Sequence, residues 1–418
     1  MEASAERRIQ DMQVILEVSR AMAGTPVLDD LLVLILSSAK RLLNADVATL
    51  FMYDEASHEL YSRFTHDTQE IRFSADLGIA GAVAKSRRPL NIPDAYADSR
   101  FNREIDRQTG YRTRCLLTIP LIGLDDRLVG VMQMVNKLDG TFTSYDEALG
   151  EALAAQVAVA LQRSQLMDHY VHKKQLEKSL AIARDIQQGL LPKKIPAVPG
   201  YDIAGWSRPA DETGGDCFDF IPLADGRLAV TLADVTGHGI GPALIMAETR
   251  ALLRAFTEHA EKPHATLERT NRWLTDDLGE GRFVTTFFGL LDPKNHQMEY
   301  ASGGHGPLFW YHAAEGRVEE SSSTGLPLGL MEPLIISSAP PVPFGKGDMG
   351  ILLTDGFLEA QTTEGEFFGT DRLVELSLKN AHLPAAEFIR TLTAAVDDFI
   401  RGGPQLDDLT AIIVKRVG

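Results

Sequence analysis

The spacing of hydrophobic residues changes three times along the chain, and each change predicts a different part of the structure. Residues 6–23 keep apolar residues on one side at helical spacing, which predicts an amphipathic helix that ends at Gly24. From 28 to 165 a helix is followed by apolar strands and a glycine-rich turn, which is an α/β pattern. A second α/β stretch at 200–418 combines apolar strands with helices predicted at 240–260, 263–278 and 384–401.

Between the two α/β stretches the chain predicts an unusually long helix. No proline occurs from Asp146 to Leu191, and apolar residues recur every three or four positions. A helix of this length without a globular partner is usually a coiled coil or a signalling connector, and the alternative is two helices with a break near His169 and Tyr170. Pro192 then ends the pattern. We therefore expect an N-terminal helix at 1–27, an α/β domain at 28–165, a helical coiled-coil connector at 166–191 and a second α/β domain at 192–418.

Composition and charge argue against several classes of protein. The 418 residues include 41 Lys and Arg against 58 Asp and Glu, a net charge of −17, which argues against binding to a nucleic-acid backbone. Cys115 and Cys217 are too few for a disulfide framework, so a reducing compartment is expected. The sequence has neither a signal-peptide core nor an apolar run of the roughly 20 residues that a membrane span needs. We expect a cytoplasmic protein with no nucleic-acid or membrane partner.

Four acidic motifs lie at the ends of predicted strands in the second α/β domain. Their carboxylates belong to Asp216, Asp234, Asp355 and the adjacent pair Asp407 and Asp408. Carboxylates at neighbouring strand ends converge, and several together cannot remain ionised without a cation. Ligation by oxygen alone suits Mg²⁺ or Mn²⁺ rather than zinc. Two such ions about 3.5–4 Å apart would activate a water for in-line attack on phosphorus.

The order of the motifs GGD, DVTGHG, GGHGP, LPLG, LLTDG and DDLT, led by ARDIQQGLLP, resembles the SpoIIE/RsbU-type branch of the PPM (PP2C-like) serine/threonine phosphatases over 176–418. The resemblance implies an α-β-β-α sandwich with two Mn²⁺ or Mg²⁺ ions between its sheets. By position, it implies metal ligation by Asp216, Asp234, Asp355, Asp407 and the carbonyl of Val235. Asp234 would bridge the ions, and a register shift of one would replace Asp407 with Asp408. The resemblance also makes Asp216, Asp234 and Asp355 catalytic.

Two histidines lie in glycine-flanked turns of the same domain. His238 and His305 could each donate a proton to the leaving seryl or threonyl oxygen or contact phosphate; the other interpretation is a structural turn histidine. We assign the catalytic role to His238 and favour the structural role for His305. The GGDCF sequence is superficially similar to the GGDEF signature of diguanylate cyclases, but its fourth residue is cysteine instead of glutamate, and the downstream Asp motifs have no role in those enzymes. Neither cysteine is followed by an arginine six residues later, which argues against a cysteine-phosphatase mechanism.

Residues 28–165 contain no comparable acidic cluster, which favours a binding module over a second enzyme. The segments LGIAGAVA, LNIPDAYADSRFN, DRQTGYRTR and NKLDGTFTSYDE resemble the GAF domains of cyclic-nucleotide phosphodiesterases and bacterial adenylyl cyclases, which are α/β sandwiches. The signature residues are Asn136, Lys137, Phe142, Asp146 and Glu147, and an ion pair between Lys137 and Asp146 would tie the last strand to the connector. Carried over by position, the resemblance implies cyclic-nucleotide contacts at Ile79, Ala80, Asp106, Thr109 and Thr113.

These features predict a metal-dependent protein serine/threonine phosphatase that is regulated by a GAF sensor, binds cAMP or cGMP and forms a homodimer. By analogy with the family, the substrate would be a phosphorylated anti-anti-sigma (STAS) type protein. Two alternatives remain open at this point. The C-terminal domain could bind a phosphoprotein without hydrolysing it, or the GAF domain could serve only for dimerisation.

Overall fold

The computed structural model describes residues 2–25, 27–62, 71–103, 106–107, 110–124, 126–237, 239–258, 260–279 and 281–418. The chain divides into two compact units, residues 1–175 and 176–418. In the described part of the chain, no helix has both the length and the apolar character that crossing a membrane requires.

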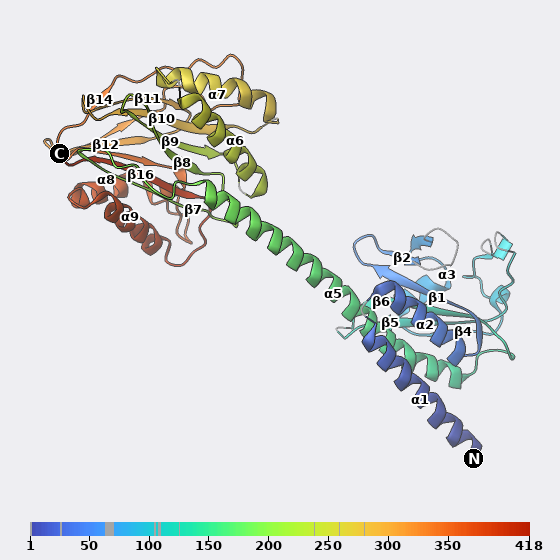
Figure 1. The fold of residues 1–418 in the computed structure, drawn as a ribbon. Coiled ribbons are helices and arrows are strands. Elements are labelled where there is room, and N and C mark those ends of the chain that lie inside the picture. The colour runs from blue at the N-terminus through green and yellow to red at the C-terminus, as the bar shows by residue number, and fades with distance from the viewer. Residues whose placement is uncertain are drawn as a thin grey trace. The chain divides into compact units, whose positions relative to one another are not determined.

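The first unit is built on a six-stranded antiparallel sheet with the order β3-β2-β1-β6-β5-β4 (Figure 1). Its elements are α1 (Glu2–Gly24), α2 (Leu28–Leu42), β1 (Ala45–Asp54), β2 (Glu59–Ser62), β3 (Ile71–Ser74), α3 (Gly78–Ser86), β4 (Leu90–Ile92), the 3₁₀ helix η1 (Ala95–Ala97), β5 (Leu116–Ile122), β6 (Leu128–Lys137) and the start of α5 (Ser144–Leu190). One face of the sheet packs against α1, α2 and α5 through a single apolar core. The other face packs against α3 and the segment around η1. This is the α/β sandwich expected for 28–165.

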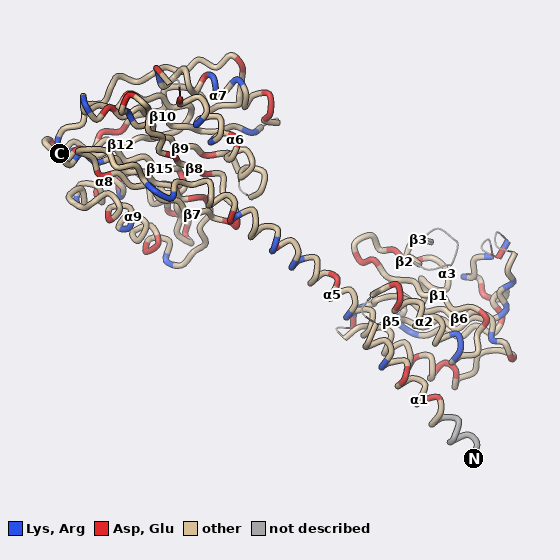
Figure 2. Tube along the Cα trace, viewed as in Figure 1, with Lys and Arg blue, Asp and Glu red and all other residues tan. Residues whose placement is uncertain are grey.

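The connector is one uninterrupted helix. α5 contains 47 residues and runs through His169 and Tyr170, so the alternative of two helices with a break there is wrong. All side chains from 166 to 179 are exposed, and Figure 2 shows acidic and basic positions interspersed along the helix. Each compact unit contains part of this one helix, which is consistent with the connector role that the periodicity predicts.

The second unit contains two five-stranded antiparallel sheets, with the orders β14-β11-β10-β9-β8 and β13-β12-β15-β16-β7. Its elements after α5 are β7 (Tyr201–Arg208), β8 (Cys217–Pro222), β9 (Leu228–Val235), α6 (Ile240–Thr257), α7 (Pro263–Asp277), β10 (Val284–Asp292), β11 (Gln297–Gly303), β12 (Leu308–His312), β13 (Arg317–Ser321), β14 (Val342–Pro343), β15 (Met349–Leu353), the 3₁₀ helix η2 (Asp355–Phe357), α8 (Gly369–Asn380), α9 (Ala385–Ile400) and β16 (Leu409–Arg416).

Alternation along the strands explains why these sheets stack. In β8, Phe218 and Phe220 join the core between the two sheets, whereas Cys217 faces the core under α6 and α7. The outer face of the second sheet is covered by α8 and α9. Because successive side chains of a strand point to opposite faces, each sheet buries both of its faces. The result is the α-β-β-α sandwich that the resemblance implies (Figure 1).

Candidate functional site

The acidic motifs come together at the meeting point of the two sheets of the second unit. Asp216 precedes β8 and Asp234 lies at the end of β9 in the first sheet, whereas Asp355 follows β15 and Asp407 precedes β16 in the second. A direct contact joins the two sheets there, because Thr354 Oγ1 donates a 2.8 Å hydrogen bond to Asp216 Oδ2. The antiparallel sheets therefore gather carboxylates that are far apart in sequence.

These carboxylates raise one another's pKa. Desolvation, followed by the charges of Asp234 and Asp408, raises the pKa of Asp216 well above its ordinary value. The pKa of Asp234 is raised to about 7, first by desolvation and then by the carboxylates of Asp355 and Asp407. Desolvation and the Glu359 carboxylate raise the pKa of Asp355, although its side chain keeps an exposed surface. A cation among them would relieve this repulsion.

The surroundings of Asp216 indicate whether the acidic site suits a cation. Asp216 is 5% exposed, and its Oδ1 atom is buried without a hydrogen-bond partner. Buried polar atoms are nearly always paired, so an unpaired carboxylate oxygen among other carboxylates fits a divalent ion that prefers oxygen ligands. As the side chains stand, no three Asp, Glu, His or Cys side chains of the described residues already enclose a metal position.

The structure distinguishes the two adjacent aspartates of the DDLT motif. Asp408 is buried, and its carboxylate accepts backbone hydrogen bonds from Ala210 (2.7 Å), Gly215 (2.6 Å) and Asp216 (3.3 Å). Asp407 is exposed, and its Oδ1 atom accepts a 2.7 Å bond from the backbone N–H of Asp408. Asp408 is thus committed to holding the GGD turn, which favours Asp407 as the metal ligand.

The two glycines of the GGD turn allow this close approach. A β-carbon on Gly214 would lie 2.2 Å from Oδ2 of Asp408, and one on Gly215 would lie 2.6 Å from the carbonyl oxygen of Val235. Both distances are far below van der Waals contact, so neither position accepts a side chain. The second distance also shows that the Val235 carbonyl, which the resemblance implies as a metal ligand, lies against the turn that carries Asp216.

The two histidines have different outcomes. His238 lies outside the described residues. His305 is buried in the turn between β11 and β12, with Nδ1 3.3 Å from Thr285 Oγ1. Burial lowers the pKa of His305 to about 4, so the ring is neutral at physiological pH, which favours the structural interpretation.

Cys217 is buried beside Asp216, and burial followed by the Asp216 charge raises the pKa of its thiol, as expected for an inert cysteine.

The end of the connector touches the GGD turn directly. Gln187, in the last turn of α5, donates a 2.5 Å hydrogen bond from Nε2 to the carbonyl of Gly214 and accepts a 3.1 Å bond at Oε1 from the N–H of the same residue. Its side-chain amide therefore pairs with the Gly214 backbone two residues before Asp216. The sequence offers no signal for this contact, because a glutamine on an exposed helix is ordinary.

The first unit contains an apolar cavity of about 530 Å³ beside α3. Its described lining includes four of the predicted cyclic-nucleotide contacts, Ile79, Ala80, Asp106 and Thr113. The fifth, Thr109, lies outside the described residues. Aromatic and aliphatic side chains form most of the wall, and the polar groups Thr49 and Gln133 line it without having been predicted. The lining suits a largely apolar ligand with a few polar groups.

Asp106 is already engaged by the protein. Its carboxylate accepts hydrogen bonds from the Tyr96 hydroxyl (3.0 Å), the Thr113 backbone N–H (2.7 Å) and the Thr113 hydroxyl (2.8 Å). In this arrangement Asp106 holds the cavity wall together, so contact with a ligand would require some of these bonds to exchange.

The GAF signature residues link the cavity wall to the connector. Asn136 accepts from the N–H of Arg114 (2.6 Å) and donates to the hydroxyl of Tyr111 (3.0 Å), which lines the cavity. The predicted ion pair is confirmed, since Lys137 Nζ lies 2.6 Å from Asp146 Oδ1. The Lys137 ammonium also lies 5.6 Å from the centre of the Phe142 ring. Asp146 and Glu147 occupy the first turn of α5, where acidic side chains stabilise a helix.

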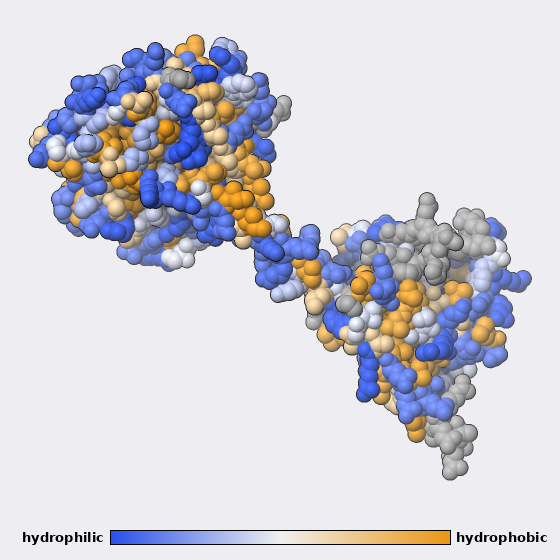
Figure 3. All heavy atoms as spheres, viewed as in Figure 1, coloured by the Kyte–Doolittle hydropathy of each residue, from blue (hydrophilic) through white to orange (hydrophobic). Residues whose placement is uncertain are grey.

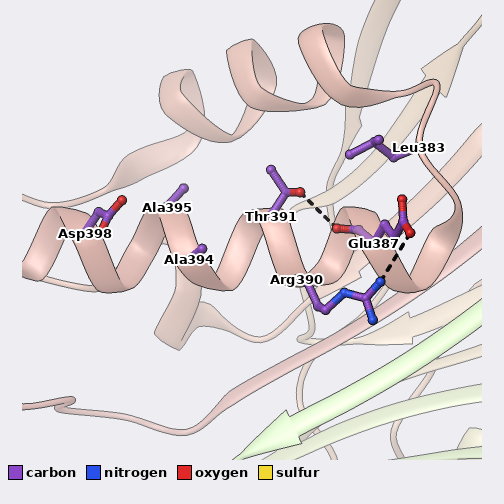
Figure 4. Close-up of a pocket in the computed structure, with 7 residues that line it drawn as sticks. All are labelled: Leu383, Glu387, Arg390, Thr391, Ala394, Ala395 and Asp398. Atoms are coloured by element: carbon purple, nitrogen blue, oxygen red, sulfur yellow. Dashed lines mark hydrogen bonds and ion pairs between the residues drawn. The ribbon is translucent and has the colours of Figure 1, made fainter.

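A separate shallow hollow of about 580 Å³ follows the outer surface of α9 (Figure 4). Its lining contains Glu387 and Arg390, which form a 3.4 Å ion pair, and the small side chains of Ala394 and Ala395. None of the predicted site residues lines this hollow, so it is not part of the acidic site.

Comparisons with known proteins assign a family to each unit. A family model described as "Stage II sporulation protein E (SpoIIE)" matches residues 224–417, and the GAF domain model matches residues 27–161. Protein IcfG of Synechocystis is 29% identical over 59% of this chain and 42% of its own length. The phosphoserine phosphatase RsbU of Bacillus subtilis is 29% identical over 58% of this chain and 72% of its own length.

The N-terminal unit has different relatives. A probable 3′,5′-cyclic phosphodiesterase of Caenorhabditis elegans is 36% identical over 37% of this chain and 23% of its own length. The chain thus spans less than half of the length of IcfG and of this phosphodiesterase. Among solved structures, the SiaA-PP2C domain of Pseudomonas aeruginosa covers 59% of this chain and 98% of its own, with 24% identity and a TM-score of 0.52, which supports the fold. The chain therefore joins a segment that matches the GAF domain model to one that matches the SpoIIE model and has a PP2C-like fold.

Proposed function

We propose that this chain is a cytoplasmic, metal-dependent protein serine/threonine phosphatase whose activity is controlled by its GAF domain. The observation that carries the proposal is the convergence of Asp216, Asp234, Asp355 and Asp407 from two sheets, with a buried, unpartnered oxygen on Asp216. These four carboxylates would hold two divalent ions, which would supply an activated water and neutralise charge during phosphoryl transfer. The buried, uncharged thiol of Cys217 makes the cysteine-phosphatase alternative unfavourable.

The chain's own residues would each have a defined task in this reaction. Asp234 and Asp216 from the first sheet and Asp355 and Asp407 from the second would hold the two ions. Asp408 fixes the GGD turn through its backbone bonds, and the Thr354 hydroxyl orients the Asp216 carboxylate. The test is hydrolysis of a phosphoserine peptide with Mn²⁺ and with a chelator. Release of phosphate only with the metal supports the proposal, whereas tight peptide binding without any hydrolysis would favour a non-catalytic phosphoprotein-binding regulator.

The physiological substrate that we propose is a phosphorylated STAS-type (anti-anti-sigma) protein. The support is the similarity to RsbU, which is described as a phosphoserine phosphatase, and it is therefore an argument from analogy. A preference of at least tenfold in kcat/KM for a phosphorylated STAS protein over an unrelated phosphoprotein would support this substrate, and equal rates would contradict it.

We further propose that the GAF cavity binds cAMP or cGMP. The predicted contact residues Ile79, Ala80, Asp106 and Thr113 line one cavity, and the backbone N–H groups at the start of α3 suit an anion such as a cyclic phosphate. Similarity to a protein described as a probable 3′,5′-cyclic phosphodiesterase points in the same direction. A GAF domain that only dimerises would show no thermal shift with either nucleotide.

Homodimerisation would use the outer face of α1 and α5. These helices lie side by side and run in the same direction, because Tyr145 bonds to Asp11 and Arg163 bonds to the carbonyl of Met22. Hydrophobic side chains remain exposed on both helices, namely Ile9, Met12, Leu16, Leu166, Met167, Tyr170 and Val171. Figure 3 shows orange patches within the blue surface of this unit. Pairing of two copies would remove this apolar surface from water.

The connector would transmit ligand binding to the catalytic turn. Coupling requires an element with two arrangements that the ligand and the active site both bias. We propose the segment 176–191 as this element, because Gln187 bonds to both backbone groups of Gly214. A rotation or shift of α5 by a fraction of a turn would break these bonds and release the turn that carries Asp216.

A further inference from the structure

A second glutamine, Gln405, is hydrogen-bonded both to Arg208 at the end of β7 and to the backbone of Asp407. Its Oε1 atom accepts a 2.7 Å hydrogen bond from Nε of Arg208 at the end of β7. Its Nε2 atom donates to two backbone carbonyls, those of Arg208 (3.0 Å) and Asp407 (2.8 Å). One side-chain amide therefore ties the backbone of the predicted metal ligand to a strand of the sheet.

Arg208 is itself held on several sides, so it gives Gln405 a fixed support. Its two terminal nitrogens bond to the Asp397 carboxylate of α9 at 3.1 and 2.6 Å. Its guanidinium carbon lies 5.6 Å from the centre of the Trp206 ring. The backbone of Arg208 pairs with Leu409 in the β16–β7 ladder. A planar guanidinium with this set of partners loses little further freedom when it donates to Gln405.

The loop that carries Asp407 needs such support. It follows α9 through Arg401 and Gly402, both of which adopt left-handed backbone conformations (φ +50° and +82°), and then Gly403 and Pro404. Asp407 itself is exposed, so packing does not fix its position. On one side the buried carboxylate of Asp408 anchors the chain to the GGD turn. On the other side the Gln405 amide holds the Asp407 carbonyl.

We propose that Gln405, supported by Arg208, is a positioning residue that holds Asp407 in place for metal binding. The inference rests on the proposed function, because it requires Asp407 to be a ligand. Hydrogen bonds to groups around a metal ligand orient it, and their loss typically lowers metal affinity by about 10–100-fold. Gln405→Ala removes all three bonds and should weaken Mn²⁺ binding about tenfold. Gln405→Met is neutral and close to glutamine in size but makes none of the three bonds, so it should weaken binding to a similar extent.

The test is calorimetric titration of Mn²⁺ into the full chain, which measures binding without reference to catalysis. Gln361→Ala is the matched control, because Gln361 is also half-buried and lines the same recess beside Asp407. In the described residues, no hydrogen bond joins its side chain to the 404–408 loop. Thermal unfolding without metal completes the set, since a purely structural role for Gln405 would lower the unfolding temperature of the metal-free protein.

Each outcome decides the question. Weaker Mn²⁺ binding in both Gln405 variants, with Gln361→Ala and the metal-free unfolding temperatures unchanged, supports the positioning role. Wild-type affinity in Gln405→Ala overturns it, as does a lower metal-free unfolding temperature with unchanged affinity. If the wild type did not bind Mn²⁺, the proposed metal-dependent function itself would be contradicted. This result distinguishes failure of the metal site from failure of the inference about Gln405.

Discussion

The Lys137–Asp146 ion pair allows a quantitative test of how the GAF unit is tied to the connector. Lys137→Met keeps an unbranched side chain of similar length and removes the charge. The two side chains are only 12% and 8% exposed, and breaking a buried pair by removing one partner costs about 3–5 kcal/mol. Asp146 keeps two hydrogen bonds from Thr143, at 2.7 and 2.8 Å. We therefore expect the lower end, a loss of about 3 kcal/mol.

Differential scanning calorimetry of the full chain measures this loss. At about 2–4 °C for each kcal/mol in a unit of this size, the GAF transition should fall by about 6–12 °C. The transition of the second unit should stay in place. Lys85→Met is the control, because the Lys85 side chain is 80% exposed and lies 4.0 Å from Asp76, so the change should be small. A shift of the GAF transition in Lys137→Met no larger than that of the control would refute the reasoning.

The pH dependence of the same variant adds an independent check. Burial alone would raise the pKa of Asp146, but the Lys137 ammonium and the Thr143 donors outweigh it, and the pKa lies below its ordinary value. A carboxyl with a lowered pKa stabilises the fold above its unfolded pKa, and this contribution is lost as the pH falls through the folded pKa. The gap between the wild type and Lys137→Met should therefore be full at pH 7 and narrow below about pH 4. A constant gap would contradict this assignment.

Three further predictions concern regulation. Gln187→Ala removes both bonds to Gly214 and should lower kcat about tenfold, or about 1.4 kcal/mol, without lowering nucleotide affinity; an unchanged kcat would exclude the coupling role. Saturating cAMP or cGMP should stabilise the GAF transition by about 2.7 kcal/mol at 100 times Kd. Ile79→Trp, which places a bulky ring in the cavity wall at a predicted contact, should abolish this shift; persistence of the shift would mean that the nucleotide binds elsewhere. Leu16→Glu combined with Tyr170→Glu should convert dimers to monomers in sedimentation, and a monomeric wild type would argue against the dimer.

Long periodic segments and strand-end motifs could be predicted from the sequence. The helices α6, α7 and α9 start and end within a few residues of their predicted limits, because each has a continuous apolar stripe and clear end signals. α8 was missed, since Gly369–Asn380 is short and buries only Leu373 and Ser377 of its side chains. Strand β7 was also missed; its central residues Ile203 and Gly205 are only half-buried, so the apolar signal is weak.

The finer features of the site depend on contacts between distant parts of the chain. Our preference for Asp407 over Asp408 as the proposed metal ligand rests on backbone N–H groups that bond to Asp408 from almost two hundred residues away in sequence. The roles proposed for Gln187 and Gln405 depend on their hydrogen bonds to the carbonyls of Gly214 and Asp407, which only the folded chain brings within reach. A glutamine has the same helix propensity and polarity wherever it occurs, so no local pattern separates these two residues from the rest.

The central claim, a catalytic metal site built from strand-end carboxylates, is tested most directly by hydrolysis of p-nitrophenyl phosphate with Mn²⁺. The comparison is between the wild type, Asp234→Asn, Asp355→Asn and Asp398→Asn, the last being an exposed aspartate on α9. We predict metal-dependent turnover in the wild type and in Asp398→Asn, and a loss of at least a hundredfold in the other two. Metal-dependent turnover that survives in both Asp234→Asn and Asp355→Asn would contradict the account.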